Sequence, residues 1–193
     1  MPPSFSGPRS TPTDRSVARG LADTLMRVGI LTVSDGCSSG TREDRSGALI
    51  EAWAGGRGYR VSARAVVPDD TASIVPLLVA WCDDLDVDLV LTTGGTGLTP
   101  RDVTPEATRL VLEKDAPGIV EEIRRNGATK TPYSSLSRGV AGTRGGTLVV
   151  NLPGSPGGVR DGLEVLELIV DHAVALSKGQ DPSHEVPAVG RMA

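Results

Sequence analysis

Residues 88–108 read DLVLTTGGTGLTPRDVTPEAT. The run Asp88–Thr93 is short, with three apolar residues, Leu89 to Leu91, at its centre, which is typical of a strand buried on both faces. Three glycines follow within four positions. Beyond them, Thr104 and Pro105 predict an N-cap followed by the first helical position, with Glu106 in the first turn. A buried strand, a glycine loop and a helix in succession indicate one unit of a parallel α/β sheet.

The same alternation recurs on both sides of this stretch. Three more apolar runs predict strands at Val28–Val33, Val61–Val67 and Thr147–Leu152. Helices are predicted at Ser46–Gly58, at Thr71–Leu85, from Thr104 to about Lys114, at Pro117–Asn126 and from Ser155-Pro156 onward. The last of these carries apolar residues at helical spacing, namely Val159, Leu163, Leu166, Val170 and Val174. We therefore predict an α/β fold whose parallel sheet is covered by helices on both faces.

The chain of 193 residues suggests a single domain between two tails. Residues 1–25, rich in Pro, Ser, Thr and Arg, are expected to be disordered, with a transit peptide as the alternative. Residues 26–180 are expected to form the domain, and 181–193 a loose tail. A net charge of −4 without a basic stripe gives no indication of nucleic-acid binding, and no run of 18 apolar residues predicts a membrane span. Cys37 and Cys82 lack CxxC spacing, which favours reduced thiols in the cytoplasm.

Four loops follow the predicted strands, at Ser34–Asp44, Pro68–Asp70, Gly94–Asp102 and Pro153–Ser155. In an open parallel sheet, ligands bind outside the carboxyl ends of the strands. We therefore expect these four loops to converge on one site.

The glycine loop fits neither common phosphate-binding pattern. The dinucleotide fingerprint lacks its third glycine, and no Gly-Lys-Ser/Thr of the Walker type occurs in the chain. Consecutive glycines can nevertheless form a concavity of backbone N–H groups that binds anions. A tight turn without a ligand explains the glycines equally well, although the hydroxyls of Thr93 and Thr96 favour a polar ligand.

Two aspartates are candidates for a metal site. If Thr104 caps the helix, Asp102 is left either as a solvated carboxylate paired with Arg101 or as a ligand that shares Mg²⁺ with substrate phosphates. Asp69 is the second candidate ligand, but it could instead cap the next helix, a role for which Asp70 competes. Asp35 and Asp44 could likewise either cap a helix or bind a metal, and we rank them below Asp69 and Asp102 as metal ligands.

Other polar residues carry weaker signals. Ser137 and Arg138 offer a hydroxyl and a bidentate oxyanion donor, or else form an ordinary surface pair. His172 and His184 lack metal-ligand spacing, so a zinc site is not expected. Trp53 and Trp81 are most simply core residues.

Several motifs in a fixed order resemble one protein family. VSD…SSG…D.SG, VVPDD, LTTGGTGLTPRDVTPEAT, LSRGVAG and NLPGSP follow one another along residues 27–178. In this order they resemble the MogA/MoaB family of molybdenum cofactor biosynthesis proteins. The similarity is greatest to the molybdopterin adenylyltransferases, which are related to the G domains of plant Cnx and animal gephyrin.

This resemblance implies a three-layer α/β/α fold with a mostly parallel sheet, a homotrimer, and the Mg²⁺-dependent reaction of molybdopterin with ATP to give adenylylated molybdopterin and pyrophosphate. It also implies a downstream molybdate-insertion protein as a possible partner. Position by position, it assigns catalysis and metal binding to Asp69 and Asp102. It assigns the nucleotide or its phosphates to Gly94, Gly95, Thr96, Gly97, Asn151, Pro153, Gly154 and Ser155, and molybdopterin to Ser137 and Arg138.

Three alternatives remain open. A MoaB-type protein could bind pterin without catalysing this reaction, and a scaffold or binding module could use the same domain. A nucleotide hydrolase related to the competence-damage proteins is less favoured because of the LSR and NLPGSP segments. Intact VPDD and TPRD motifs favour the enzyme.

Overall fold

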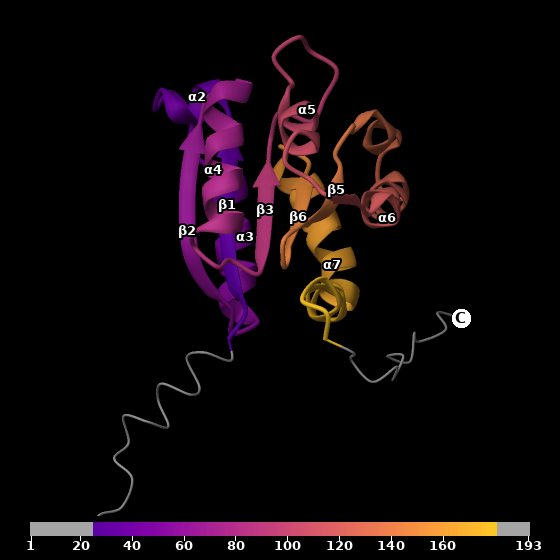
Figure 1. Cartoon of the computed structure of the whole chain (residues 1–193). Helices are drawn as coiled ribbons and strands as arrows, with labels where there is room; N and C mark the ends of the chain where they lie inside the picture. The colour runs from indigo at the N-terminus through magenta and orange to yellow at the C-terminus, as the bar shows by residue number, and fades with distance from the viewer. Residues whose placement is uncertain (1–24, 181–193) are drawn as a thin grey trace, which may run out of the picture.

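The protein is built around a six-stranded sheet with the order β2-β1-β3-β6-β5-β4 (Figure 1). The computed structural model describes residues 25–180. Four strands run parallel, namely β1 (Arg27–Val33), β2 (Arg60–Val67), β3 (Leu89–Thr93) and β6 (Thr147–Leu152). Two short antiparallel strands, β5 (Ala141–Arg144) and β4 (Lys114–Asp115), extend the sheet at one edge. The prediction of a mostly parallel sheet is therefore confirmed.

Helices cover both faces of this sheet. On one face lie α3 (Arg45–Gly56), α6 (Pro117–Ala128) and α7 (Pro156–Ser177), and on the other α4 (Thr71–Asp83) and α5 (Thr104–Arg109). A four-residue helix, α2 (Asp35–Ser38), follows β1, and a 3₁₀ turn, η1 (Pro132–Leu136), follows α6. The arrangement is the predicted α/β/α sandwich of three layers (Figure 1).

Side chains of the central strands alternate between the two helical layers, as the two-residue period of a strand requires. Ile30 of β1 packs toward the α7 side and Leu31 toward the α4 side, and both are fully buried. Trp81 is almost fully buried, as predicted, against a strand position that must be glycine. A β-carbon added at Gly29 would lie 2.8 Å from the indole Cε3. Trp53, by contrast, is only half-buried and meets Tyr59 edge to face.

The segment after α5 departs from the prediction. The helix that starts at Thr104 ends at Arg109 instead of continuing to about Lys114. The backbone N–H of Glu113 donates to the Thr143 carbonyl, and that of Ala116 donates to the Ala141 carbonyl. These bonds draw the chain into β4, beside a hairpin of β5 and β6 that turns at Gly145 and was not predicted. Pairing with a distant strand thus overrides the local helical pattern.

The expected tails lie outside the described residues, apart from Leu25, and so does His184. The predicted domain boundaries therefore stay a prediction. Within residues 25–180, none of the helices is both long and apolar enough to span a membrane.

Candidate active site

A cavity of about 610 Å³ opens at the carboxyl ends of the parallel strands. In Figure 1 this is the edge of the sheet to which the arrowheads of β2 and β3 point, beside α2. All four loops named from the sequence contribute to its wall, so their predicted convergence is confirmed. The residues that line it are Thr32, Val33, Ser34, Cys37, Arg42, Glu43, Asp44, Arg45, Ser46, Asp69, Thr93, Gly94, Gly95, Asp102, Gly154, Ser155 and Pro156.

The glycine loop forms part of this wall because the backbone there is crowded from several sides. Gly94 and Gly95 both adopt positive φ angles, of 95° and 62°. A β-carbon at Gly94 would lie 2.1 Å from the Val33 carbonyl oxygen, and one at Gly95 would lie 3.1 Å from an Asp69 carboxylate oxygen. Glycine is thus needed for conformation and for the close approach of neighbouring loops.

Hydroxyl groups bind this loop to its neighbours. The Thr104 hydroxyl donates to the Gly94 carbonyl at 2.9 Å, and the Thr93 hydroxyl donates to the Pro153 carbonyl at 2.7 Å. Ser46, at the start of α3, donates to the Gly154 carbonyl at 2.8 Å. These side chains hold the glycine loop, the loop after β6 and the starts of α3 and α5 in a fixed relation around the cavity.

The prediction that Thr104 caps α5 is wrong. The capping position is Val103, which provides no side-chain hydrogen bond, and Thr104 is the first helical residue. Its hydroxyl is fully buried and serves the glycine loop instead.

Asp102 accepts hydrogen bonds within its own loop. Its carboxylate accepts from the Thr99 N–H at 2.8 Å. Burial opposes ionisation, but hydrogen bonds from Thr99 and the Gly97 amide, with the charge of Arg138, lower the pKa of Asp102 overall. The alternative pairing with Arg101 does not occur, because Arg101 pairs with Asp35. Asp102 is therefore held as an anion at the cavity wall.

Asp69 is free of the capping role that competed for it. Asp70 is the N-cap of α4 and accepts from the Ser73 N–H at 2.7 Å. The Asp69 carboxylate accepts from the Asp35 N–H at 2.7 Å and faces the cavity. Burial, followed by the negative charges of Asp35 and Asp102, raises the pKa of Asp69. A cation in the cavity would offset both effects.

Two helices begin at the cavity. The start of α3 is capped by Asp44, and the start of α7 is capped by Ser155, which accepts from the Gly158 N–H at 3.1 Å. Helix N-termini carry partial positive charge and favour anions. Arg42 and Arg45 also line the cavity, although Arg45 pairs with Glu43, which lines it as well. The start of α7 and the Arg42 side chain are therefore the groups best suited to phosphate.

The two carboxylates fit Mg²⁺ only when a ligand supplies further oxygens. Across residues 25–180, no group of three or more His, Cys, Asp or Glu side chains is arranged to hold a metal ion. Asp69 and Asp102 together provide two hard oxygen donors at one cavity. Mg²⁺ commonly binds through one or two carboxylates plus substrate phosphates. The donor set therefore fits Mg²⁺ that arrives with a nucleotide.

Several predicted site residues lie outside the cavity wall. Asn151 is buried, accepts from the Val140 N–H at 3.2 Å and donates to the hydroxyls of Thr92 and Thr108 at 2.9 Å each. Its observed contacts are those of a residue that joins β6 to its neighbours. Thr96, Gly97 and Pro153 also contact other loops without lining the cavity.

Ser137 and Arg138 also lie outside it. Arg138 Nε donates to the Gly97 carbonyl at 2.6 Å, its Nη2 donates to the Asp102 carbonyl, and its Nη1 pairs with Glu106. Arg138 thus holds the outer side of the Asp102 loop, and a role for this pair in binding molybdopterin stays a prediction.

The individual wall residues missed from the sequence come mainly from the first loop and from α3. Arg42, Arg45 and Ser46 had a signal in the D.SG motif and in the position of that loop after β1. Their side chains alone could not be distinguished from those of a solvated surface loop.

The chain is similar to several known proteins. The family model described as "probable molybdopterin binding domain" matches residues 29–172. The Drosophila melanogaster molybdenum cofactor synthesis protein cinnamon is 40% identical over 77% of the chain, which spans about a quarter of that protein's length. A Helicobacter pylori molybdopterin adenylyltransferase is 37% identical, with 80% of this chain and 89% of that protein covered. The crystal structure of the molybdopterin biosynthesis enzyme MoaB from Thermus thermophilus superposes with a TM-score of 0.77 at 48% identity, covering 81% of this chain and 98% of that one.

Proposed function

The chain belongs to the probable molybdopterin binding domain family of molybdenum cofactor biosynthesis, and from that premise we propose that it is a molybdopterin adenylyltransferase. The substrates would be ATP and molybdopterin, and the products adenylylated molybdopterin and pyrophosphate. Relatives named molybdopterin adenylyltransferase are similar over 72–80% of this chain and match 72–89% of their own length. The longer relatives share only this domain with it.

One observation carries the proposal. Asp69 and Asp102 come from two different loops, yet they line one cavity together with the glycine loop and the starts of α3 and α7. A wall that places carboxylates beside helix N-termini and arginines suits a metal–polyphosphate ligand, because each sign of charge then has its counterpart. A site for a neutral ligand would need neither the carboxylates nor the positively charged groups.

The reaction needs little acid–base chemistry from the protein. A terminal phosphate oxygen of molybdopterin would form a bond to the α-phosphorus of ATP while the bond to the pyrophosphate oxygen breaks. Because that nucleophile is already anionic, no general base is required. This accounts for the lack of His among the residues that line the cavity. Catalysis would rest on positioning and on charge stabilisation.

The residues would divide this work by location. Gly94 and Gly95 let the backbone approach the phosphates, and the starts of α3 and α7 stabilise negative charge there. Asp69 and Asp102 would hold Mg²⁺, which when bound neutralises phosphate charge. The hydrogen bonds that keep Asp102 ionised also keep it ready for that role.

Further parts of the proposal rest on the family alone. Ser137 and Arg138 would contact molybdopterin on the outer side of the Asp102 loop. The protein would act as a homotrimer in the cytoplasm and pass its product to a molybdate-insertion protein.

Asparagine variants of the two aspartates test the assignment. Asp69→Asn and Asp102→Asn keep the shape of each side chain but remove its charge. We expect kcat for adenylylation to fall at least about 100-fold in each at saturating Mg-ATP, as when a charge-stabilising group is lost from an active site. Asp115→Asn, an exposed residue of β4, is the matched control and should retain the parental rate. Near-normal turnover by Asp102→Asn would refute the assignment.

A MoaB-type protein without this activity is the second candidate, because a MoaB structure is 48% identical to the chain. Binding of molybdopterin with no release of pyrophosphate from ATP would favour it.

A further inference from the structure

Asp35 occupies an unusual position at the rim of the cavity. It is the first residue of α2, directly after the loop residue Ser34, and its side chain is about half exposed. It is not among the residues that line the cavity. Nevertheless, its backbone and carboxylate together contact the loops that follow β2 and β3.

The contact with the β2 loop is reciprocal. The Asp35 N–H donates to Asp69 Oδ2 at 2.7 Å, and the Asp69 N–H donates to Asp35 Oδ1 at 3.0 Å. Two such bonds between the same residues fix both the backbone separation and the direction of the Asp69 carboxylate. Within the described part of the chain, the Asp35 amide is the only protein hydrogen-bond donor to the Asp69 side chain.

The contact with the β3 loop is bidentate. Arg101 Nε donates to Asp35 Oδ2 at 3.0 Å, and Nη2 donates to Oδ1 at 2.7 Å. A fork of this kind fixes orientation as well as distance. Arg101 directly precedes Asp102, whose own carboxylate is bound to the Thr99 amide in the same loop. Asp35 is therefore joined to the residue beside Asp102 and to Asp69 itself.

Stability does not provide a sufficient reason for this arrangement. Both side chains of the pair are more than half exposed, at 51% and 60%. Exposed ion pairs contribute little to folding because water screens them and ordering two side chains costs entropy. Their geometric effect is larger, because the pair joins α2 to the loop that carries Asp102, and Asp35 also binds Asp69.

We propose that Asp35, through its pair with Arg101, is a positioning residue that sets the separation and orientation of Asp69 and Asp102 for a divalent cation bound with nucleotide. This inference rests on the proposed function, and it assigns a role in that site to two residues outside the cavity wall. Partners of this kind commonly change metal affinity or activity by about 10- to 100-fold when they are removed.

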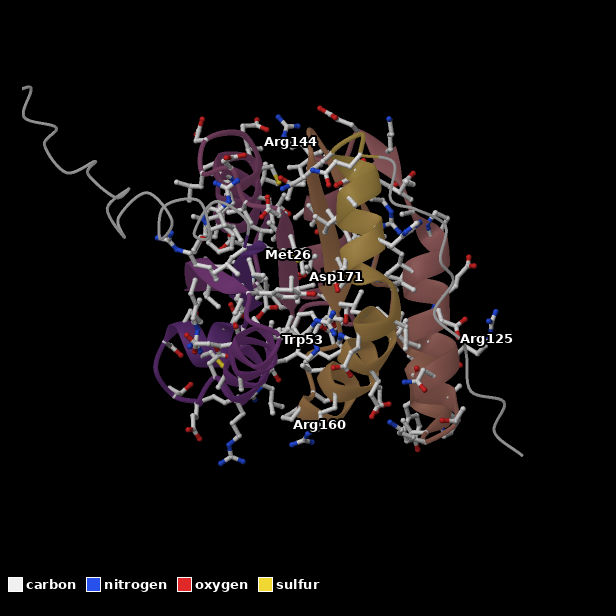
Figure 2. The ribbon with its side chains drawn as sticks, turned by 90° about the horizontal axis from the view of Figure 1, so that it is seen from below. Met26, Trp53, Arg125, Arg144, Arg160 and Asp171 are labelled. Atoms are coloured by element: carbon white, nitrogen blue, oxygen red, sulfur yellow. The ribbon has the colours of Figure 1, made fainter. Side chains whose placement is uncertain are left out.

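The chain offers a matched control. Arg144 and Asp83 form another bidentate pair, with Nε–Oδ1 and Nη2–Oδ2 distances of 2.9 and 2.7 Å, between β5 and the last residue of α4. Neither residue lines the cavity, and Arg144, labelled in Figure 2, pairs with Thr147 at the amino end of β6, opposite the carboxyl ends of the parallel strands. Asp83→Asn removes the same kind of charge from the same kind of pair.

The experiment compares Asp35→Asn, Arg101→Gln, the double variant and Asp83→Asn in the full chain. Binding of Mn²⁺ in the presence of ATP is measured by calorimetry, and adenylylation of molybdopterin is measured in parallel at saturating Mg-ATP. We expect each single cavity-rim variant to weaken Mn²⁺ binding and lower kcat by about 10-fold or more. The Mn²⁺ affinity and kcat of the double variant should be no lower than those of the more impaired single variant, because both substitutions remove the same ion pair. The melting temperatures of the Asp35 and Arg101 variants should match that of Asp83→Asn. That control variant should bind Mn²⁺ with the parental affinity.

Two results would overturn the inference. One is an unchanged Mn²⁺ affinity in Asp35→Asn or Arg101→Gln. The other is a double variant whose loss of Mn²⁺ affinity equals the product of the two single losses. Failure of the proposed function gives a different pattern. In that case the parental protein forms no adenylylated molybdopterin, while the Mn²⁺ comparison among variants still tests the positioning role.

Discussion

Replacing Gly94 by alanine should destabilise the protein more than the same replacement at Gly40. Both glycines have positive φ angles, of 95° and 73°. A non-glycine residue in this conformation costs about 1–2 kcal/mol. At Gly40 nothing lies within 4 Å of the added β-carbon, so this conformational cost is the whole effect.

At Gly94 the added carbon also meets the backbone. It would lie 2.1 Å from the Val33 carbonyl oxygen, so either β1 or the glycine loop must move. Overpacking of this kind typically costs a further ~1–3 kcal/mol. We therefore expect Gly94→Ala to lower the free energy of unfolding by about 2–5 kcal/mol.

Equilibrium unfolding in urea, followed by circular dichroism, measures both variants against the parental protein. The difference between them should also appear as a melting temperature lower by about 2–12 °C for Gly94→Ala. If Gly94→Ala lost no more stability than Gly40→Ala, the close approach of the glycine loop to β1 would not be a constraint. The physical reason given for GGTG would then be wrong.

Two further predictions concern residues away from the cavity wall. Burial, assisted by a hydrogen bond to Asp171, raises the pKa of Tyr59 from 10.0 to about 12. The stability that comes from this protonated phenol is therefore complete below pH 10 and is lost as the pH rises toward about 12. Between pH 10 and about 12, the urea midpoint of the parental protein should fall more steeply than that of Tyr59→Phe. An equal fall of the two midpoints with pH would contradict the raised pKa of Tyr59. Asn151→Ala should lose about 1–3 kcal/mol of stability, because buried groups lose their partners, but should keep its affinity for Mg-ATP. Weakened nucleotide binding at unchanged stability would instead show a direct contact.

The cluster around Tyr59 illustrates how α3 is joined to α7. Asp171 accepts from both Tyr59 and Arg57, and the Arg57 guanidinium lies 5.2 Å from the Tyr59 ring centre and 5.8 Å from that of Trp53. Figure 2 shows Trp53 and Asp171 near the middle of the view from below. Titration of Tyr59 therefore reports on packing between the two helices, remote from the cavity.

The central strands were predictable because they are buried on both faces. Burial of this kind requires continuous apolar runs, and Thr147–Leu152 was located to the residue. The short strands β4 and β5 lack such runs. β4 depends on backbone pairing with β5 between residues 27–29 positions apart, such as Lys114 with Thr143, and no local sequence pattern indicates that pairing. β5 pairs with the adjacent β6 in a hairpin, but its own four residues are too short and too polar to stand out as a strand.

The location of the site was predictable for a topological reason. Loops at the carboxyl ends of parallel strands meet at one edge of the sheet, so four segments could be grouped without knowing their contacts. The role of each side chain was less accessible. Whether Asp69 or Asp70 capped α4 depended on tertiary geometry, and Asn151 in its strand looked the same whether it bound a ligand or bridged Val140 and Thr92.

The most direct test of the proposed activity is a product analysis. The purified chain is incubated with molybdopterin, ATP and Mg²⁺, and the pterin and phosphate products are quantified together. We predict adenylylated molybdopterin and pyrophosphate in equal amounts, with neither formed when Mg²⁺ is chelated. Stable binding of molybdopterin, with no pyrophosphate released from ATP, would contradict the account.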